Sequence, residues 1–102
     1  LQDAVDVFQR AARIFPDQEA YFLWLTGRVQ FRQDLFAEAA WSYRKALETV
    51  QHDWRIYADL GKACACLAQV EDAAAAFEKA MELAPEGELP RLRKMASRLA
   101  SV

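Results

Sequence analysis

The chain has 102 residues and a net charge of −2, with 54% hydrophobic and 27% charged residues. This length suits one small domain, residues 1–102, and the composition excludes a disordered tail. The longest apolar run with large side chains covers only 20–25, whereas a membrane span needs roughly 18 or more apolar residues. A duplex-DNA binder usually has a strong basic excess, which this chain lacks. We therefore expect neither membrane insertion nor a nucleic-acid partner.

Alanine occupies 20 positions, whereas Val, Ile and Thr together occupy 10, a balance that favours helices over strands. Pro16 and Pro85 should end the helices before them. Asp17 and Asp53 are expected N-caps, because a carboxylate accepts hydrogen bonds from the first unpaired amides of a helix. Apolar spacing and these signals predict helices, in chain order, over 2–15, 18–33, 35–50, 53–67, 70–84 and 90–101.

Three of the predicted helices share a pattern that recurs every 34 or 35 residues. Small residues let two helix backbones approach closely, and an aromatic ring fills the space beside them. A glycine, Gly27 or Gly61, stands 12 residues before the second and third copies of the pattern. The two small residues and one aromatic of each copy are Ala4, Phe8 and Ala11, then Ala39, Tyr43 and Ala46, then Ala73, Phe77 and Ala80.

This pattern resembles the tetratricopeptide repeat (TPR), W-x2-L-G-x2-Y…A-x3-F…P. Residues 54–87 fit it well, with Cys64 in place of an aromatic, and residues 20–53 depart from it at Thr26, Gln30 and Gln51. The resemblance implies an all-α, helical-repeat (TPR-like) solenoid of antiparallel helix pairs with a C-terminal capping helix. In that scheme 1–18 is the second helix of a partial repeat, 20–53 and 54–87 are full repeats, and 88–102 is the capping helix.

Charge is segregated by helix type. The resemblance implies that the first helix of each pair lines the concave side of the solenoid. The segments of that type, 20–33, 54–67 and 89–102, carry eight basic residues against one acid, for a net charge of +7. The remaining helices and the turns carry net charges of −3 and −6.

The concave face is therefore expected to be a basic and aromatic groove. Such a groove would bind a peptide or partner protein that carries acidic and apolar groups, so the chain would serve as an adaptor or scaffold. Equally, Tyr21, Trp24 and Phe31 could pack under the neighbouring repeat. A clamp for a peptide C-terminal carboxylate, found in one TPR subtype, is not expected with these side chains. The expected partner-binding residues are Tyr21, Trp24, Arg28, Phe31, Arg55, Asp59, Lys62 and Arg93.

No arrangement of residues typical of an enzyme, metal site or cofactor site is found in the sequence. His52 is the only histidine, and we expect it in a solvated turn. Cys64 and Cys66 are expected to be small buried residues in a reducing compartment, which favours the cytoplasm. We therefore expect no catalytic residues, no metal and no cofactor.

Two other functions remain open. The helix 2–15 lacks a partner helix but has an apolar face that needs cover, so the chain could self-assemble into a homo-oligomer. A third possibility is a dedicated chaperone for a secreted protein, a role of some small helical-repeat proteins in bacteria. The residues of the apolar face, and so of possible self-association, are Val5, Phe8, Ala12 and Phe15.

Overall fold

The computed structural model describes residues 18–100, with the side chains of 18–98. The helices are α2 (Glu19–Arg32), α3 (Phe36–Thr49), α4 (Trp54–Cys66), α5 (Val70–Leu83) and α6 (Leu89–Ala100), with a 3-10 turn, η2 (Glu86–Glu88), before α6. No strand occurs within these described residues, so the all-α prediction is confirmed. Each helix begins and ends within one residue of its predicted bounds. The predicted helix 2–15 lies outside the described residues.

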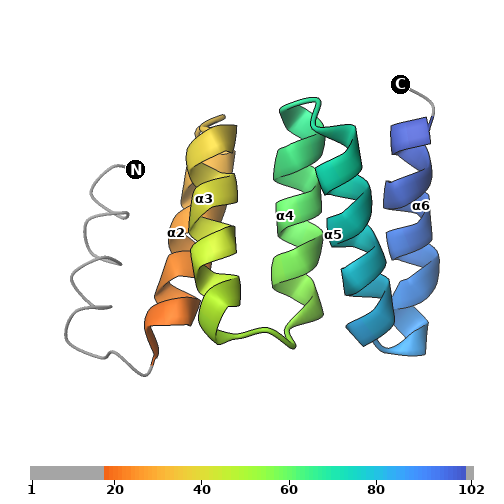
Figure 1. Ribbon diagram of the computed structural model, residues 1–102, viewed down its shortest axis with the longest axis horizontal. Coiled ribbons are helices and arrows are strands. Elements are labelled where there is room, and N and C mark those ends of the chain that lie inside the picture. Colours follow the sequence, from red (N-terminus) through yellow and green to blue (C-terminus); the bar gives the residue numbers. More distant parts are fainter. Residues whose placement is uncertain (1–17, 101–102) are drawn as a thin grey trace.

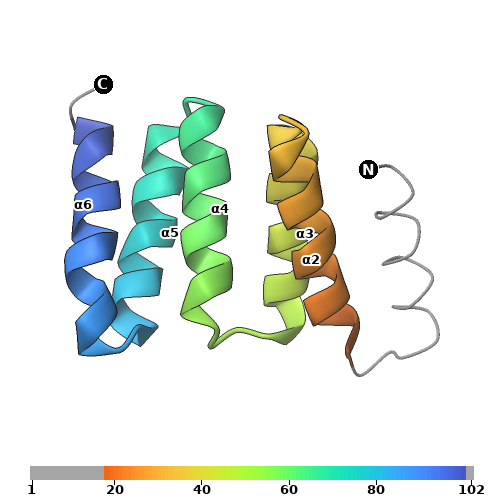
Figure 2. The same ribbon diagram turned by 180° about the vertical axis from the view of Figure 1, so that it is seen from behind.

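The helices stand in a row in sequence order, and the connections between successive helices lie alternately at the top and at the bottom of the row (Figure 1). Contacts run from α2 to α3, α3 to α4, α4 to α5 and α5 to α6, and α2 also touches α4. In Figure 1 α2 lies behind α3, and in the reverse view of Figure 2 it lies in front. The row therefore has two faces, and α2 and α3 lie toward opposite ones.

The pairs α2–α3 and α4–α5 repeat the same close contact. A Cβ atom added to Gly27 would lie 2.5 Å from the ring of Tyr43, and one added to Gly61 would lie 2.8 Å from the ring of Phe77. Both rings are 2% exposed. The aromatic ring of one helix thus fills the space that the missing glycine side chain leaves on its neighbour.

The turns inside the two pairs also share one geometry. Asp34 and Ala68 have φ angles of 62° and 60°. After each of them an amide reaches back across the end of the helix: Leu35 N–H donates to the Gln30 carbonyl and Gln69 N–H to the Cys64 carbonyl, both at 2.9 Å. This Schellman pattern satisfies carbonyl groups that the end of a helix leaves unpaired.

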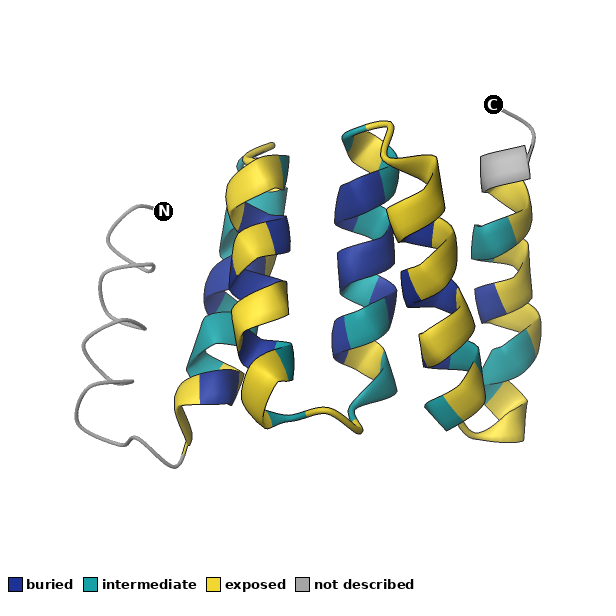
Figure 3. Ribbon diagram, viewed as in Figure 1, coloured by how far each residue is buried: buried dark blue, intermediate teal, exposed yellow. Residues whose placement is uncertain are grey.

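Buried residues lie where helices face one another, and exposed residues cover the outer surfaces of α3 and α5 (Figure 3). The core is built from small residues with a few large ones between them. Its most buried members are Ala39, Ala46, Ile56, Ala63, Cys64, Ala73 and Ala80, each 0% exposed. No helix of the part described is long and apolar enough to cross a membrane.

The helix starts follow the prediction in one case. Asp53 is the N-cap of α4, and its carboxylate accepts a hydrogen bond from the Arg55 amide at 3.0 Å. Helix α2 has Gln18 as its N-cap, with no side-chain hydrogen bond. The other predicted cap, Asp17, lies outside the described residues.

One of the two cysteines was assigned wrongly. Cys64 is buried, but Cys66 is exposed. Residues two apart on an α-helix point about 200° away from each other, so when Cys64 faces the core Cys66 must face outward.

Candidate binding face

Helices α2, α4 and α6 share one hollowed face. A cavity of about 260 Å³, here called the central cavity, is lined only by side chains of these three helices. They correspond to the three basic segments of the sequence. Five of the expected partner-binding residues line the central cavity: Trp24, Arg28, Arg55, Asp59 and Lys62.

Trp24 takes part in the packing between helices and also lines the central cavity. Its indole N–H donates to Asp59 Oδ2 at 2.7 Å, a bond that joins α2 to α4. The guanidinium groups of Arg28 and Arg55 lie 5.4 and 4.7 Å from its ring centroid, within cation–π range. The ring is half-buried against the core. The Trp24 ring therefore has one part packed against the core and another part that lines the cavity.

The acid of the central cavity offsets part of its positive charge. Besides Trp24, Asp59 contacts the ammonium of Lys62, with Lys62 Nζ 3.6 Å from Asp59 Oδ1. At the edge of the cavity Arg55 makes two further bonds, from Nε to Asp53 Oδ1 at 3.0 Å and from Nη2 to Asp53 Oδ2 at 2.7 Å. These bonds hold the pKa of Asp53 below its ordinary value and raise the pKa of Arg55. Of the cations that line the central cavity, Arg55, Lys62 and Arg91 thus have anionic partners, whereas Arg28 lies over the Trp24 ring.

The remaining predicted site residues lie elsewhere. Tyr21 is 43% exposed and sits at one edge of the face, beside a hollow that it shares with Arg55. Phe31 is half-buried, and its ring meets Phe36 edge to face at 5.2 Å. Arg93 is exposed on α6 and lines none of the cavities described here. Val5, Phe8, Ala12 and Phe15 lie outside the described residues.

A cavity of about 270 Å³ continues the hollow between α2 and α4. The buried ring of Tyr43 forms its base, with Arg28 and Asp59 beside it. Burial raises the pKa of Tyr43 far above its usual range; the charge of Asp59 raises it further, and Arg28 opposes the shift. Tyr43 is therefore a neutral, structural part of the face.

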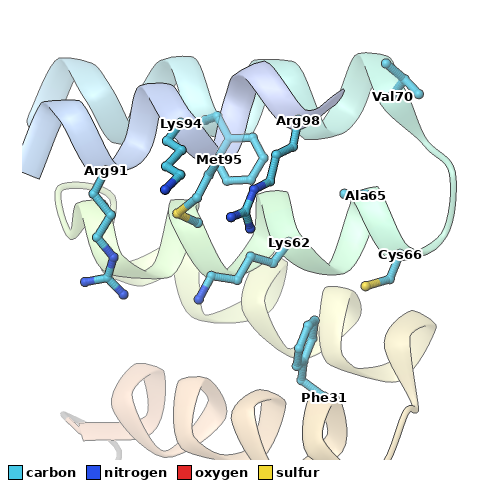
Figure 4. Close-up of a pocket in the computed structure, with 10 residues that line it drawn as sticks. Phe31, Lys62, Ala65, Cys66, Val70, Arg91, Lys94, Met95 and Arg98 are labelled. Carbon is cyan, nitrogen blue, oxygen red and sulfur yellow. The ribbon is translucent and has the colours of Figure 1, made fainter. Parts of the chain in front are cut away.

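A hollow of about 550 Å³ lies toward the C-terminal end and is here called the α4–α6 cavity (Figure 4). Its apolar lining comes from Phe31, Ala65, Val70, Phe77 and Met95. Cys66 lies at one end of it, and its cationic lining is Lys62, Arg91, Lys94 and Arg98. No acidic residue lines this cavity.

The cations of the α4–α6 cavity differ in their partners. Lys62 contacts Asp59, and Arg91 lies 3.8 Å from Glu88 in an exposed pair. Lys94 and Arg98 form no ion pair with any residue in the described part of the chain. In Figure 4 both extend from α6 toward α4, with Met95 beside them.

The residue that the sequence analysis named on α6, Arg93, does not line this cavity, whereas Arg91, Lys94 and Arg98 do. The signal was present, because Arg91, Lys94 and Arg98 stand at the i, i+3, i+7 spacing of one helical face. Arg93 is two residues from Arg91, and so about 200° around the helix from it.

The described residues offer little for metal binding. No three His, Cys, Asp or Glu side chains between residues 18 and 98 are grouped so that they could hold a metal ion. His52 is exposed in the turn before α4, as expected.

No protein-family model matches the chain, and no curated protein is similar to it. The function proposed below rests on the residues and contacts of the face formed by α2, α4 and α6.

Proposed function

We propose that this chain is a protein-interaction module of TPR-like construction, with antiparallel helix pairs stacked as a solenoid and α6 as its cap. It holds a segment of a partner protein on the face formed by α2, α4 and α6. Two repeated features support the construction. The glycine–aromatic contact recurs between Gly27–Tyr43 and Gly61–Phe77, and the left-handed turn residue recurs between Asp34 and Ala68.

The single observation that carries the binding role is the α4–α6 cavity. It offers an apolar hollow of about 550 Å³ that opens on the same face as the central cavity, a size usual for ligand sites. Affinity in such a groove comes mainly from burial of an apolar side chain of the ligand. Charged groups guide the approach of the ligand and fix its register along the groove. The exposed, unpaired cations of α6 suit the second task.

As an adaptor or scaffold the chain needs no catalytic group and no cofactor. The free thiol of Cys66, exposed beside the cavity, suits a reducing compartment such as the cytoplasm. Self-assembly and a chaperone role remain predictions from sequence, because the residues described favour neither.

The test is a selection of binding peptides followed by a cavity-filling substitution. Peptides are selected on the whole chain from a random display library, and their affinities are measured by fluorescence anisotropy. Ala65→Trp places an indole in the α4–α6 cavity, whereas Ala75→Trp adds the same side chain at an exposed position of α5 that lines neither cavity. We expect Ala65→Trp to weaken binding at least about tenfold, or about 1.4 kcal/mol, and Ala75→Trp to leave it unchanged.

Amide chemical shifts give a second readout, since a bound peptide should perturb α2, α4 and α6 more than the outer surfaces of α3 and α5. Selected peptides that bind both tryptophan variants equally, or that perturb only the outer surfaces, would refute the proposed function.

A further inference from the structure

We propose that the bound segment is acidic, and that it inserts a large apolar side chain into the α4–α6 cavity while its carboxylates contact Lys94 and Arg98. This inference rests on the function proposed above and specifies the ligand of that same face.

The first step is the charge of the lining. Four cations and no acid surround the α4–α6 cavity. Two of them, Lys94 and Arg98, have no ion-pair partner in residues 18–98. A ligand that brings carboxylates here supplies partners that the fold itself does not supply. A basic ligand would meet four like charges.

The second step is the apolar part of the lining. Phe31, Ala65 and Met95 contribute apolar surface to the cavity, and the buried ring of Phe77 also lines it. Contact between water and such an apolar surface is unfavourable, so a ligand side chain that covers the surface gains binding free energy from its burial. Alternation of an apolar anchor with acidic neighbours in the ligand would match both parts of the lining.

The third step is the contrast with the central cavity. There Asp59 already contacts Lys62 and accepts the Trp24 indole N–H, Asp53 holds Arg55, and Arg28 is engaged with the Trp24 ring. An acidic ligand would compete with these carboxylates. The acidic segment is therefore expected to be centred on α6 and the C-terminal half of α4, away from the aromatic wall at Trp24.

The test uses peptide pools of defined charge as probes. One pool has a central Leu, Phe or Trp flanked by Asp and Glu, and two matched pools carry Asn and Gln, or Lys and Arg, in place of the acids. We expect the acidic pool to bind the whole chain at least about tenfold more tightly than either other pool, which is about 1.4 kcal/mol. Its affinity should fall as salt is added, because the cations are exposed to solvent.

Two arginines of α6 give a matched pair of variants. Arg98→Glu reverses a charge that lines the cavity, and Arg93→Glu makes the same change on the same helix at a position that lines none of the cavities described. We expect Arg98→Glu to weaken binding of the acidic pool by about tenfold and Arg93→Glu by less than about twofold. Circular dichroism shows whether each variant is folded; Lys94→Gln with Arg98→Gln is the gentler variant should Arg98→Glu unfold.

Several outcomes would overturn the inference. If the neutral pool binds as tightly as the acidic pool, the preference for an acidic ligand is refuted. The proposed function still stands in that case if Ala65→Trp weakens binding of the library-selected peptides. Equal losses from the two arginine variants show only a general charge effect. Tighter binding of a short fatty acid at the same site assigns the cavity to an amphiphile. A dimer that light scattering detects, and that Arg98→Glu dissociates, assigns it to a second copy of the chain.

Discussion

The glycine–aromatic contacts provide a direct test of the packing within the two helix pairs, because neither Gly27 nor Gly61 has room for a methyl group. A Cβ atom at Gly27 would lie 2.5 Å from Cε1 of Tyr43, and one at Gly61 would lie 2.8 Å from Cε1 of Phe77. Carbon atoms in favourable contact lie about 3.5–4.0 Å apart, so each helix pair must open or its ring must move. Overpacking of this kind costs about 1–3 kcal/mol, and alanine returns up to about 1 kcal/mol of helix propensity.

The distances favour the upper part of that range, so we expect Gly27→Ala and Gly61→Ala each to lower the free energy of unfolding by about 2 kcal/mol. Urea denaturation followed by circular dichroism measures the loss. The matched control is Gly87→Ala, since an added Cβ there meets nothing within 4 Å. Replacing Phe77 by Leu in the Gly61→Ala background should recover part of the loss, because the smaller side chain vacates the space. Wild-type stability in both glycine variants would refute the packing described for the two helix pairs.

Three further predictions concern single residues. Ala68→Gly should stabilise the fold by about 0.5–1 kcal/mol in urea denaturation, because Ala68 has a φ of 60° and left-handed backbone is costly for alanine; Asp34→Gly should gain less, since aspartate tolerates this region better. The pKa of Asp53 lies below its ordinary 3.8 because Arg55 donates hydrogen bonds to it. The contribution of Asp53 to stability is therefore complete above pH 3.8 and disappears as the pH falls through the lowered pKa. Asp53→Asn should accordingly flatten the acid limb of a curve of stability against pH. A thiol reagent should modify Cys66 alone in the folded chain, because Cys64 is buried and burial raises the pKa of its thiol, and reaction of both thiols without denaturant would contradict this.

The helices and the repeated pair contacts could be predicted because they depend on local spacing. The positions of Gly27 and Gly61 relative to Tyr43 and Phe77 are fixed by the repeat, and the contacts occur where the pattern indicates. The turns were harder, since neither Asp34 nor Ala68 is the glycine that usually signals a left-handed residue. Hydrogen bonds across the end of the helix hold both residues there in spite of their side chains.

The binding face could be predicted only in outline. Segregation of basic residues on alternate helices is visible in sequence, and five of the eight expected residues line the central cavity. The Trp24–Asp59 bond was not predictable, because it joins residues 35 apart in sequence. The rotation of α6 was also undetermined from the sequence: Arg98, which lines the α4–α6 cavity, was not among the expected residues, and Arg93, which was, does not line it.

The charge on α6 works against its own stability. Arg91, Arg93, Lys94 and Arg98 lie on a helix that contains no acid. Lys94 stands three residues after Arg91 and four before Arg98, spacings at which like charges on a helix repel each other. Cations kept at these spacings indicate another requirement, which we assign to the ligand. Neutralising Lys94 to Gln should therefore stabilise the unliganded fold, by about 0.2–0.5 kcal/mol for each like-charge pair removed, and weaken binding of the acidic probe. Thermal unfolding with and without the probe measures both effects on one sample. If this variant is less stable without the probe, the Lys94 side chain supports the fold, and its positive charge needs no ligand to explain it.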